Sequence, residues 1–210
     1  MLRAFFLFVS VSGLVLAQNT DEEKRILAKI DAALEIKQGY LVADIGTGDE
    51  AFFPIHLSRS VGPSGTVTCV DIDEQAMKKL KENLRKESVQ NVDFIIGKPN
   101  DPKLPTDHFD LILISSAYHE MTEYRDMLSH IIQALKPGGR LVVKESILPS
   151  RRKEPREVQV GKHEISSDLV QQELRQAGFE IVNVIEPLYM DKETVRWLLV
   201  ANRPAAVHNK

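Results

Sequence analysis

An acidic residue and a glycine-rich turn stand where the first long apolar run of the chain ends. The run is Tyr40–Ile45, and the chain continues Gly46-Thr47-Gly48 after Asp44-Ile45. Glycines at such a turn let the backbone approach a ligand closely, and the following helix presents free amides. The spacing Gly46-x-Gly48-x-x-Ala51 matches a dinucleotide-binding turn only weakly. Asp44 would repel a pyrophosphate, so the turn favours a cationic ligand.

A second acid ends the next apolar run, in the segment Val70-Asp71-Ile72-Asp73. Parallel strands bring their carboxyl ends to one edge of a sheet, where open α/β folds bind ligands. Asp71 is therefore positioned to accept hydrogen bonds from both hydroxyls of a ribose. Ile72 beside it can cover one face of a purine.

The elements that position these residues follow from the apolar pattern. Continuous apolar runs without alternation are typical of parallel strands covered on both faces, and they alternate here with amphipathic helices. This order predicts a doubly wound α/β fold with right-handed crossovers. The last two strands have no helix between them, which predicts an antiparallel pair at the sheet edge. The predicted strands are residues 40–45, 66–70, 92–96, 109–114, 141–143, 179–184 and 195–201.

The predicted helices have recognisable ends. The first begins at Thr20, where Glu23 completes a capping box, and Gly39 stops it. Others begin at Asp73, span residues 124–135, and run from a Ser166-Ser167 cap to Ala177. Residues 151–161 are polar and are expected to form a surface excursion.

The motifs together resemble the class I S-adenosylmethionine-dependent methyltransferases. The landmarks occur in the family's order over residues 20–203, and the chain looks most like bacterial enzymes related to quinone-ring methyltransferases. The resemblance implies a seven-stranded, mostly parallel Rossmann-like sheet with an antiparallel last strand. The landmarks are Val42–Gly48, Val70–Asp73, Leu104-Pro105, Phe109–Ile112 and Leu135–Leu141.

The resemblance also implies which residues hold S-adenosylmethionine. Asp44, Gly46 and Gly48 would line its methionine end. Ser115, at the end of the fourth strand, is a further candidate for cofactor binding. Asp71 would bind the ribose, Ile72 the purine, and either Asn100 or Asp101 the adenine edge. The family usually has a third glycine where this chain has Glu50. Glu50 either faces solvent at the helix start, favoured by the helix dipole, or crowds the cofactor.

Residues for the methyl acceptor are expected after the fourth strand, in Tyr118-His119-Glu120. Methyl transfer requires in-line approach to the sulfonium carbon, so positioning is important, and a base helps when the acceptor carries a proton. His119 is the candidate base, Glu120 its orienting partner, and Tyr118 a wall of the site. Alternatively, His119 only caps the next helix.

Other candidate sites are weaker. The zinc-protease pattern His-Glu-x-x-His is absent because Glu123 follows His119-Glu120, and no metal is expected. His163-Glu164 reads as surface. Arg151-Arg152-Lys153 reads as a solvated loop or, alternatively, as a substrate lid or anion-binding patch.

Two rival functions share this fold. A nicotinamide-dependent reductase is disfavoured because no Tyr is followed four residues later by Lys. A non-catalytic cofactor-binding module is favoured somewhat by Glu50 and by the predicted export described below.

Composition limits the class of protein. The chain has 210 residues, 43% hydrophobic and 27% charged, which fits one globular domain with a sizeable core. A net charge of −3 argues against nucleic-acid binding through bulk positive charge. The methyltransferase resemblance implies a small-molecule acceptor as the partner. The single cysteine, Cys69, lies in an apolar strand and is expected to be an inert core thiol. Oligomeric state is not indicated.

The first seventeen residues resemble a secretory signal peptide. Arg3 precedes a short apolar run that ends Val15-Leu16-Ala17, and the run is too short for a typical membrane span. The predicted organisation is a signal peptide at 1–17, an N-terminal helix within 18–38, the methyltransferase domain at 39–203 and a tail at 204–210. The protein is then periplasmic or secreted, without a membrane span; an uncleaved anchor is the alternative.

Overall fold

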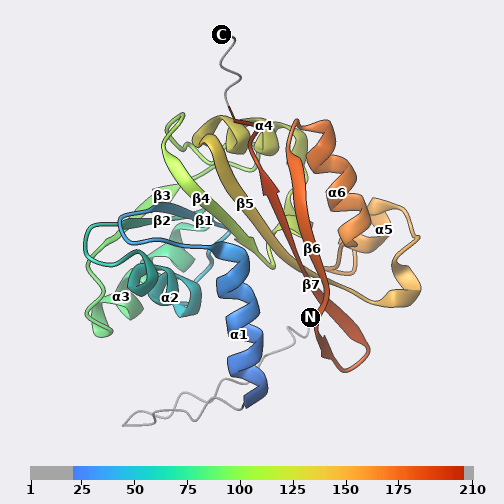
Figure 1. Ribbon diagram of the computed structural model, residues 1–210, viewed down its shortest axis with the longest axis horizontal. Coiled ribbons are helices and arrows are strands. Elements are labelled where there is room, and N and C mark those ends of the chain that lie inside the picture. The colour runs from blue at the N-terminus through green and yellow to red at the C-terminus, as the bar shows by residue number, and fades with distance from the viewer. Residues whose placement is uncertain (1–20, 206–210) are drawn as a thin grey trace.

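A seven-stranded sheet forms the centre of the protein in the computed structural model, which describes residues 21–205 (Figure 1). The strand order is β3-β2-β1-β4-β5-β7-β6. All neighbours pair in parallel except β7, which is antiparallel to both β5 and β6. The predicted doubly wound fold with an antiparallel last strand is therefore confirmed. The strands are β1 (Leu41–Ile45), β2 (Thr66–Asp71), β3 (Val92–Ile96), β4 (Phe109–Ser115), β5 (Leu135–Ile147), β6 (Glu180–Asp191) and β7 (Thr194–Asn202).

Helices cover both faces of the sheet, which explains why its central strands are apolar without alternation. One buried cluster joins the sheet to α1, α2 and α3, and the other joins it to α4 and α6. Cys69 lies in the first cluster, fully buried, as expected. The helices are α1 (Asp21–Leu34), α2 (Phe52–Val61), α3 (Glu74–Lys86), α4 (Tyr124–Ala134), α5 (Arg156–Val160) and α6 (Ser167–Gln176), with single turns η1 (Tyr118–Glu120) and η2 (Pro149–Arg151).

Most helix ends follow the predicted caps. Asp73 caps α3 by accepting hydrogen bonds from the amides of Gln75 and Ala76, and the hydroxyl of Ser166 caps α6. The end of α1 differs from the prediction. The helix stops at Leu34 because Glu35 adopts a left-handed conformation at φ 48°, four residues before Gly39.

Two C-terminal segments are more ordered than predicted. Strand β6 continues past residue 184 to Asp191, because it forms a long hairpin with β7 in which Asp191 pairs with Thr194. The expected surface excursion at 151–161 contains α5 and the fully buried side chain of Gln159.

Some expectations concern residues that the structure does not describe. The predicted signal peptide at 1–17 and the cap at Thr20 lie outside residues 21–205, as does most of the predicted C-terminal tail. Within the described part of the chain, no helix has the length and apolar character needed to cross a membrane.

Candidate functional site

The two glycines of the turn after β1 have different surroundings. Both have left-handed backbone conformations, with φ 73° at Gly46 and 65° at Gly48. A Cβ on Gly46 would lie 2.3 Å from the Cβ of Ala117, in the loop that follows β4. A Cβ on Gly48 would meet nothing within 4 Å. Gly46 is thus required for packing, whereas Gly48 borders open space in which a ligand can approach the backbone.

Asp71 joins this turn to the end of β2. Its Oδ2 accepts a hydrogen bond from the amide of Gly48 at 2.8 Å, and its Oδ1 accepts one from the amide of Asp73 at 2.9 Å. Each carboxylate oxygen has a second lone pair available for a ligand hydroxyl. The carboxylate is therefore held in one orientation at the edge of the open space beside Gly48.

Asp44 is buried beneath the same turn, with 3% of its surface exposed. Burial raises the pKa of its carboxyl to about 7; a hydrogen bond from Thr47 opposes this effect, and the charge of Asp71 adds to it. A buried carboxyl so close to ionisation at neutral pH gains stability from a nearby positive charge. This matches the predicted preference for a cationic ligand.

The predicted adenine-binding residues lie at the ends of β2 and β3. Ile72 is 59% exposed, which is unusual for a large apolar side chain directly after a buried strand. The loop after β3 makes a tight turn in which Lys98 and Asp101 pair through their backbones. The side chain of Asp101 accepts a hydrogen bond from the amide of Lys103, and Asn100 lies within the turn. Which of the two, Asn100 or Asp101, contacts a ligand stays a prediction.

These residues fit S-adenosylmethionine. Gly48 lacks a Cβ, which would otherwise occupy part of the open space beside the turn. Asp71 offers acceptor lone pairs next to this space. Ile72, the next residue, exposes an apolar side chain. A buried carboxyl lies beneath the turn. Together these residues provide a carboxylate that accepts hydrogen bonds from ribose hydroxyls, an apolar surface for a base and a nearby negative charge. A cationic nucleoside requires these three features.

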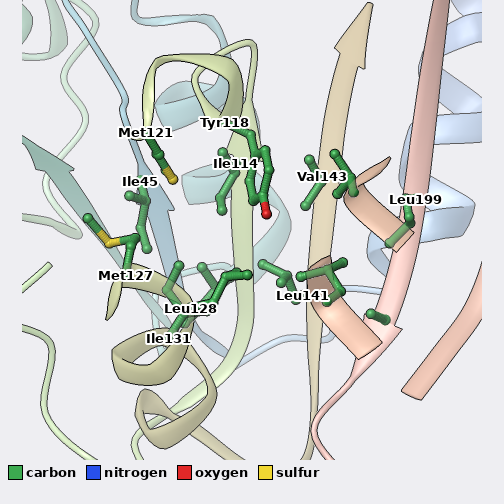
Figure 2. Packing of buried hydrophobic residues seen from close by; sticks show 14 of the residues in the cluster. Ile45, Ile114, Tyr118, Met121, Met127, Leu128, Ile131, Leu141, Val143 and Leu199 are labelled. Carbon is green, nitrogen blue, oxygen red and sulfur yellow. The ribbon is translucent and has the colours of Figure 1, made fainter. Parts of the chain in front are cut away.

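Tyr118, predicted as a wall of the acceptor site, lies in the hydrophobic core. Its side chain is fully buried and packs near Ile114 and Val143 (Figure 2). Its hydroxyl donates a hydrogen bond to Glu173 of α6 at 2.7 Å. Burial, reinforced by the Glu173 charge, raises the pKa of the phenol far above its usual value. This geometry favours a structural role for Tyr118.

His119 has a partner that the sequence did not indicate. Its Nδ1 lies 3.0 Å from both carboxylate oxygens of Glu145, a residue of β5 that is 1% exposed. The backbone amide of His119 also donates to Glu145 at 3.2 Å. Burial works to lower the pKa of His119, but the hydrogen bond and charge of Glu145 outweigh it and raise that pKa. Glu120, the predicted partner, lies on the other side of the ring, 3.8 Å from Nε2.

A pocket of about 570 Å³ opens beside His119. This volume is in the range of small-molecule sites. Arginine side chains contribute positive charge to its wall, and Arg156 is held in place by an ion pair to Glu173 at 2.9 Å. The pocket is lined by His119, Glu120, Thr122, Tyr124, Arg125, Arg156, Glu157, Val160, Gly161 and His163.

Lys144 is a second residue of the site that was not predicted from the sequence. It aligns with Ser115 across β4 and β5, and its Nζ lies 3.3 Å from the Ser115 hydroxyl. Burial lowers the pKa of Lys144 to about 8, aided by the charge of Arg196 and opposed by Glu145 and Glu50. The sequence feature that could have identified Lys144 is the pair Lys144-Glu145 directly after the apolar run 141–143. It resembles the acidic residues at the ends of β1 and β2.

Glu50 is exposed and precedes the first residue of α2. Its carboxylate is close enough to Lys144 to raise the pKa of that amine. The position agrees with the solvent-facing alternative.

The basic run after β5 is engaged by carboxylates. Arg151 pairs with Glu164 at 3.0 Å, and Arg152 pairs with Asp168 and Glu186. These pairs neutralise both guanidinium groups, which disfavours an anion-binding patch there. They bind the excursion to α6 and β6.

Comparison with known proteins agrees with this geometry. A family model described as a methyltransferase domain matches residues 36–195, more than half of the chain. The solved structure of a SAM-dependent methyltransferase from Aquifex aeolicus superimposes with a TM-score of 0.72 at 24% identity, covering 88% of this chain and 94% of that one. This likeness establishes the fold.

Two curated relatives are similar in sequence over about half of the chain. The ubiquinone/menaquinone biosynthesis C-methyltransferase UbiE of Azotobacter vinelandii is 36% identical over 118 residues, 55% of this chain and 46% of the relative. The demethylmenaquinone methyltransferase of Lactococcus lactis is 35% identical over 105 residues, 50% of this chain and 40% of the relative. The chain thus spans less than half the length of these relatives.

Proposed function

The chain belongs to the class I S-adenosylmethionine-dependent methyltransferases, and from this membership we propose that it transfers a methyl group to a small-molecule acceptor. The observation that carries the proposal is the Gly48–Asp71 arrangement, an open backbone approach beside a fixed carboxylate. A small-molecule acceptor is supported by the names of the quinone-biosynthesis relatives and by the size of the pocket beside His119.

The proposed roles follow from where each side chain lies. Asp71 would bind the ribose hydroxyls, Gly48 would allow the methionine end to approach, and Ile72 would cover the adenine. S-adenosylmethionine supplies an electrophilic methyl group on a positively charged sulfur. The buried carboxyl of Asp44 supplies a compensating negative charge under the turn.

Acceptor handling is assigned to the loop after β4. Ala117 packs directly on Gly46, so the cofactor turn and the loop that carries His119 are in contact. We propose that the acceptor binds in the pocket beside the His119 loop. His119 is the candidate base for an acceptor that must lose a proton, with Glu145 fixing its ring.

Isothermal titration calorimetry with S-adenosylmethionine, S-adenosylhomocysteine and NADH tests the proposal. We expect both adenosyl ligands to bind and NADH not to bind. Tight binding of NADH alone would instead support a reductase. Binding of the adenosyl ligands without methyl transfer to any member of a quinol, phenol and amine panel would support a non-catalytic module.

We also propose that residues 1–17 direct export of the protein. The support is the sequence pattern alone, a single basic residue followed by a short apolar run and small residues. N-terminal sequencing of protein from its native host should begin at or near Gln18. Recovery of the intact Met1 terminus from the cytoplasm would contradict export.

A further inference from the structure

Three side chains of types that can bind a metal converge at the pocket beside His119. They are His119 and Glu120 of η1, and His163 from the loop after α5. One ligand atom from each lies within 4.8 Å of the other two. The two imidazole rings meet edge to face, with centroids 5.7 Å apart.

The ring of His119 is oriented as a metal ligand would be. Nδ1 is used by the buried carboxylate of Glu145 at 3.0 Å, so Nε2 is the nitrogen left for a ligand. Histidines that bind metals nearly always donate their other ring N–H to a carboxylate or carbonyl group, which fixes the ring and its tautomer. Nε2 is also the atom that lies 3.8 Å from the Glu120 carboxylate.

We propose that His119, Glu120 and His163 bind one divalent transition-metal ion of the zinc class. Two imidazoles and one carboxylate form a donor set that suits zinc and leaves a coordination position open. Ligand atoms of a tetrahedral zinc site lie roughly 3.3 Å from one another, given bonds of about 2.0–2.2 Å. Glu120 and His163 are exposed, so rotation of their side chains closes the remaining gap.

The loop that carries His163 is held in place by the protein. The buried amide of Gln159 donates to the carbonyl groups of Arg152 and Glu154 and accepts from the amide of Ser166. His163 itself has a left-handed backbone at φ 57°, and its backbone amide donates a hydrogen bond to the carbonyl of Val160 at 3.0 Å. Two of the three ligands are thus positioned before an ion binds: His119 by Glu145, and the backbone of His163 by this braced loop.

The open position of the ion would adjoin the 570 Å³ pocket, because all three ligands line it. Arg125 and Arg156 line the same pocket. Glu120 and Glu157 line it as well, so the wall carries both signs of charge. A water molecule or a substrate group occupies the open position in catalytic zinc sites.

The metal site explains a convergence that a general base does not require. A base needs only His119 and Glu145, whereas here the Glu120 carboxylate and the His163 ring also lie beside the His119 ring. An ion on Nε2 also excludes its use as a base at the same time. The metal site does not depend on the proposed methyl transfer, and measured zinc binding would contradict the sequence-based expectation that no metal binds.

Zinc binding by the untagged, chelator-stripped chain tests the site, using Zn²⁺ titration and the absorption spectrum of the Co²⁺ form. We expect one ion per chain. His163→Asn and Glu120→Gln should each weaken binding at least tenfold, on the order seen when metal-site residues are altered. Asparagine tolerates the left-handed backbone at position 163, and both side chains are exposed, so the variants should fold.

His130→Asn is the matched control, because His130 is an exposed histidine of α4 outside the cluster. It should bind zinc like the parent, and all four proteins should bind S-adenosylhomocysteine equally. Zinc binding that is absent in the parent, or equally strong in the parent and His163→Asn, would overturn the site. Loss of S-adenosylhomocysteine binding in the parent would instead count against the methyltransferase proposal.

Discussion

The backbone amide of Gly48 donates a hydrogen bond to the carboxylate of Asp71 across 2.8 Å, linking the turn after β1 to the end of β2. The bond is made between residues 23 positions apart. The same carboxylate that is expected to bind the ribose therefore also shapes the glycine turn. If Asp71 binds the ribose as proposed, one side chain couples ligand binding to the conformation of the turn.

Asp71→Ala is expected to weaken S-adenosylhomocysteine binding by about 1.5–3 kcal/mol, because charge-assisted hydrogen bonds to the ribose are lost. Calorimetry measures the change. Asp73→Ala is the control: it removes the cap of α3, should cost about 1 kcal/mol of stability and should leave binding intact. Unchanged affinity in Asp71→Ala would refute the ribose assignment.

Gly48→Ala is expected to reduce ligand affinity, whereas Gly46→Ala is expected to reduce the stability of the fold. Both place a side chain on a left-handed backbone, at a cost of about 1–2 kcal/mol. At Gly48 the new methyl group enters open space, so the protein should fold and lose ligand affinity. At Gly46 it collides with Ala117, so thermal unfolding should show a larger loss of stability. Full binding by Gly48→Ala would show that the ligand does not approach there.

Asp44→Asn is expected to stabilise the ligand-free protein above pH 7. The folded pKa of Asp44 is about 7 against 3.8 when unfolded, so the folded state binds more protons between these values. The free energy of unfolding therefore falls as pH rises from about 4 to 7, by about 2–4 kcal/mol. Denaturant titrations of parent and variant should coincide near pH 4 and diverge toward pH 7. Parallel curves across this window would contradict the assignment.

Lys144→Met is expected to have the opposite pH dependence. The folded pKa of Lys144 is lowered to about 8 from 10.5, so below pH 8 the protein carries the cost of a buried charge. The variant should be more stable than the parent by about 1–3 kcal/mol at pH 7. This gain should disappear as pH rises from 8 to 10.5, where the parent amine loses its proton in both states. A constant difference over that window would place the cause elsewhere.

Glu50→Gly is expected to leave S-adenosylhomocysteine binding unchanged, because the carboxylate is exposed ahead of α2. The variant should lose roughly 0.3–1 kcal/mol through the helix dipole, with a further loss from glycine flexibility. Calorimetry and thermal unfolding separate the two effects. A tenfold gain in affinity would mean that Glu50 crowds the cofactor.

The sheet was predictable because its signals are local. The central strands are mainly apolar without strict alternation. Asp73 and Ser166 are typical cap residues and mark the starts of the helices that follow them. The acids and glycines at the ends of β1 and β2 could be grouped for the same reason, since parallel strands end at a common edge.

The partners around His119 were not predictable, because they depend on contacts between distant segments. Glu145 lies inside β5, and its side chain is directed to the α4 and α6 face, which no local pattern reveals. His163 reaches His119 only because Gln159 and the arginine ion pairs fold the excursion back on the sheet. The prediction that His163 is exposed is confirmed. Its contact with His119 was not predicted.

The brace formed by Gln159 holds residues 148–166 together from within, while the ion pairs of Arg152 join this segment to α6 and β6. The side chain of Gln159 forms hydrogen bonds with Arg152, Glu154 and Ser166, all of which lie within residues 148–166. The turn beside Gly48 and Asp71 is built from the opposite half of the chain. Exchange of this segment would therefore change the lining of the pocket beside His119 and leave the turn at Gly48 and Asp71 as it is. A chimera with a foreign segment must keep the ion pairs to Asp168 and Glu186 to dock on the sheet.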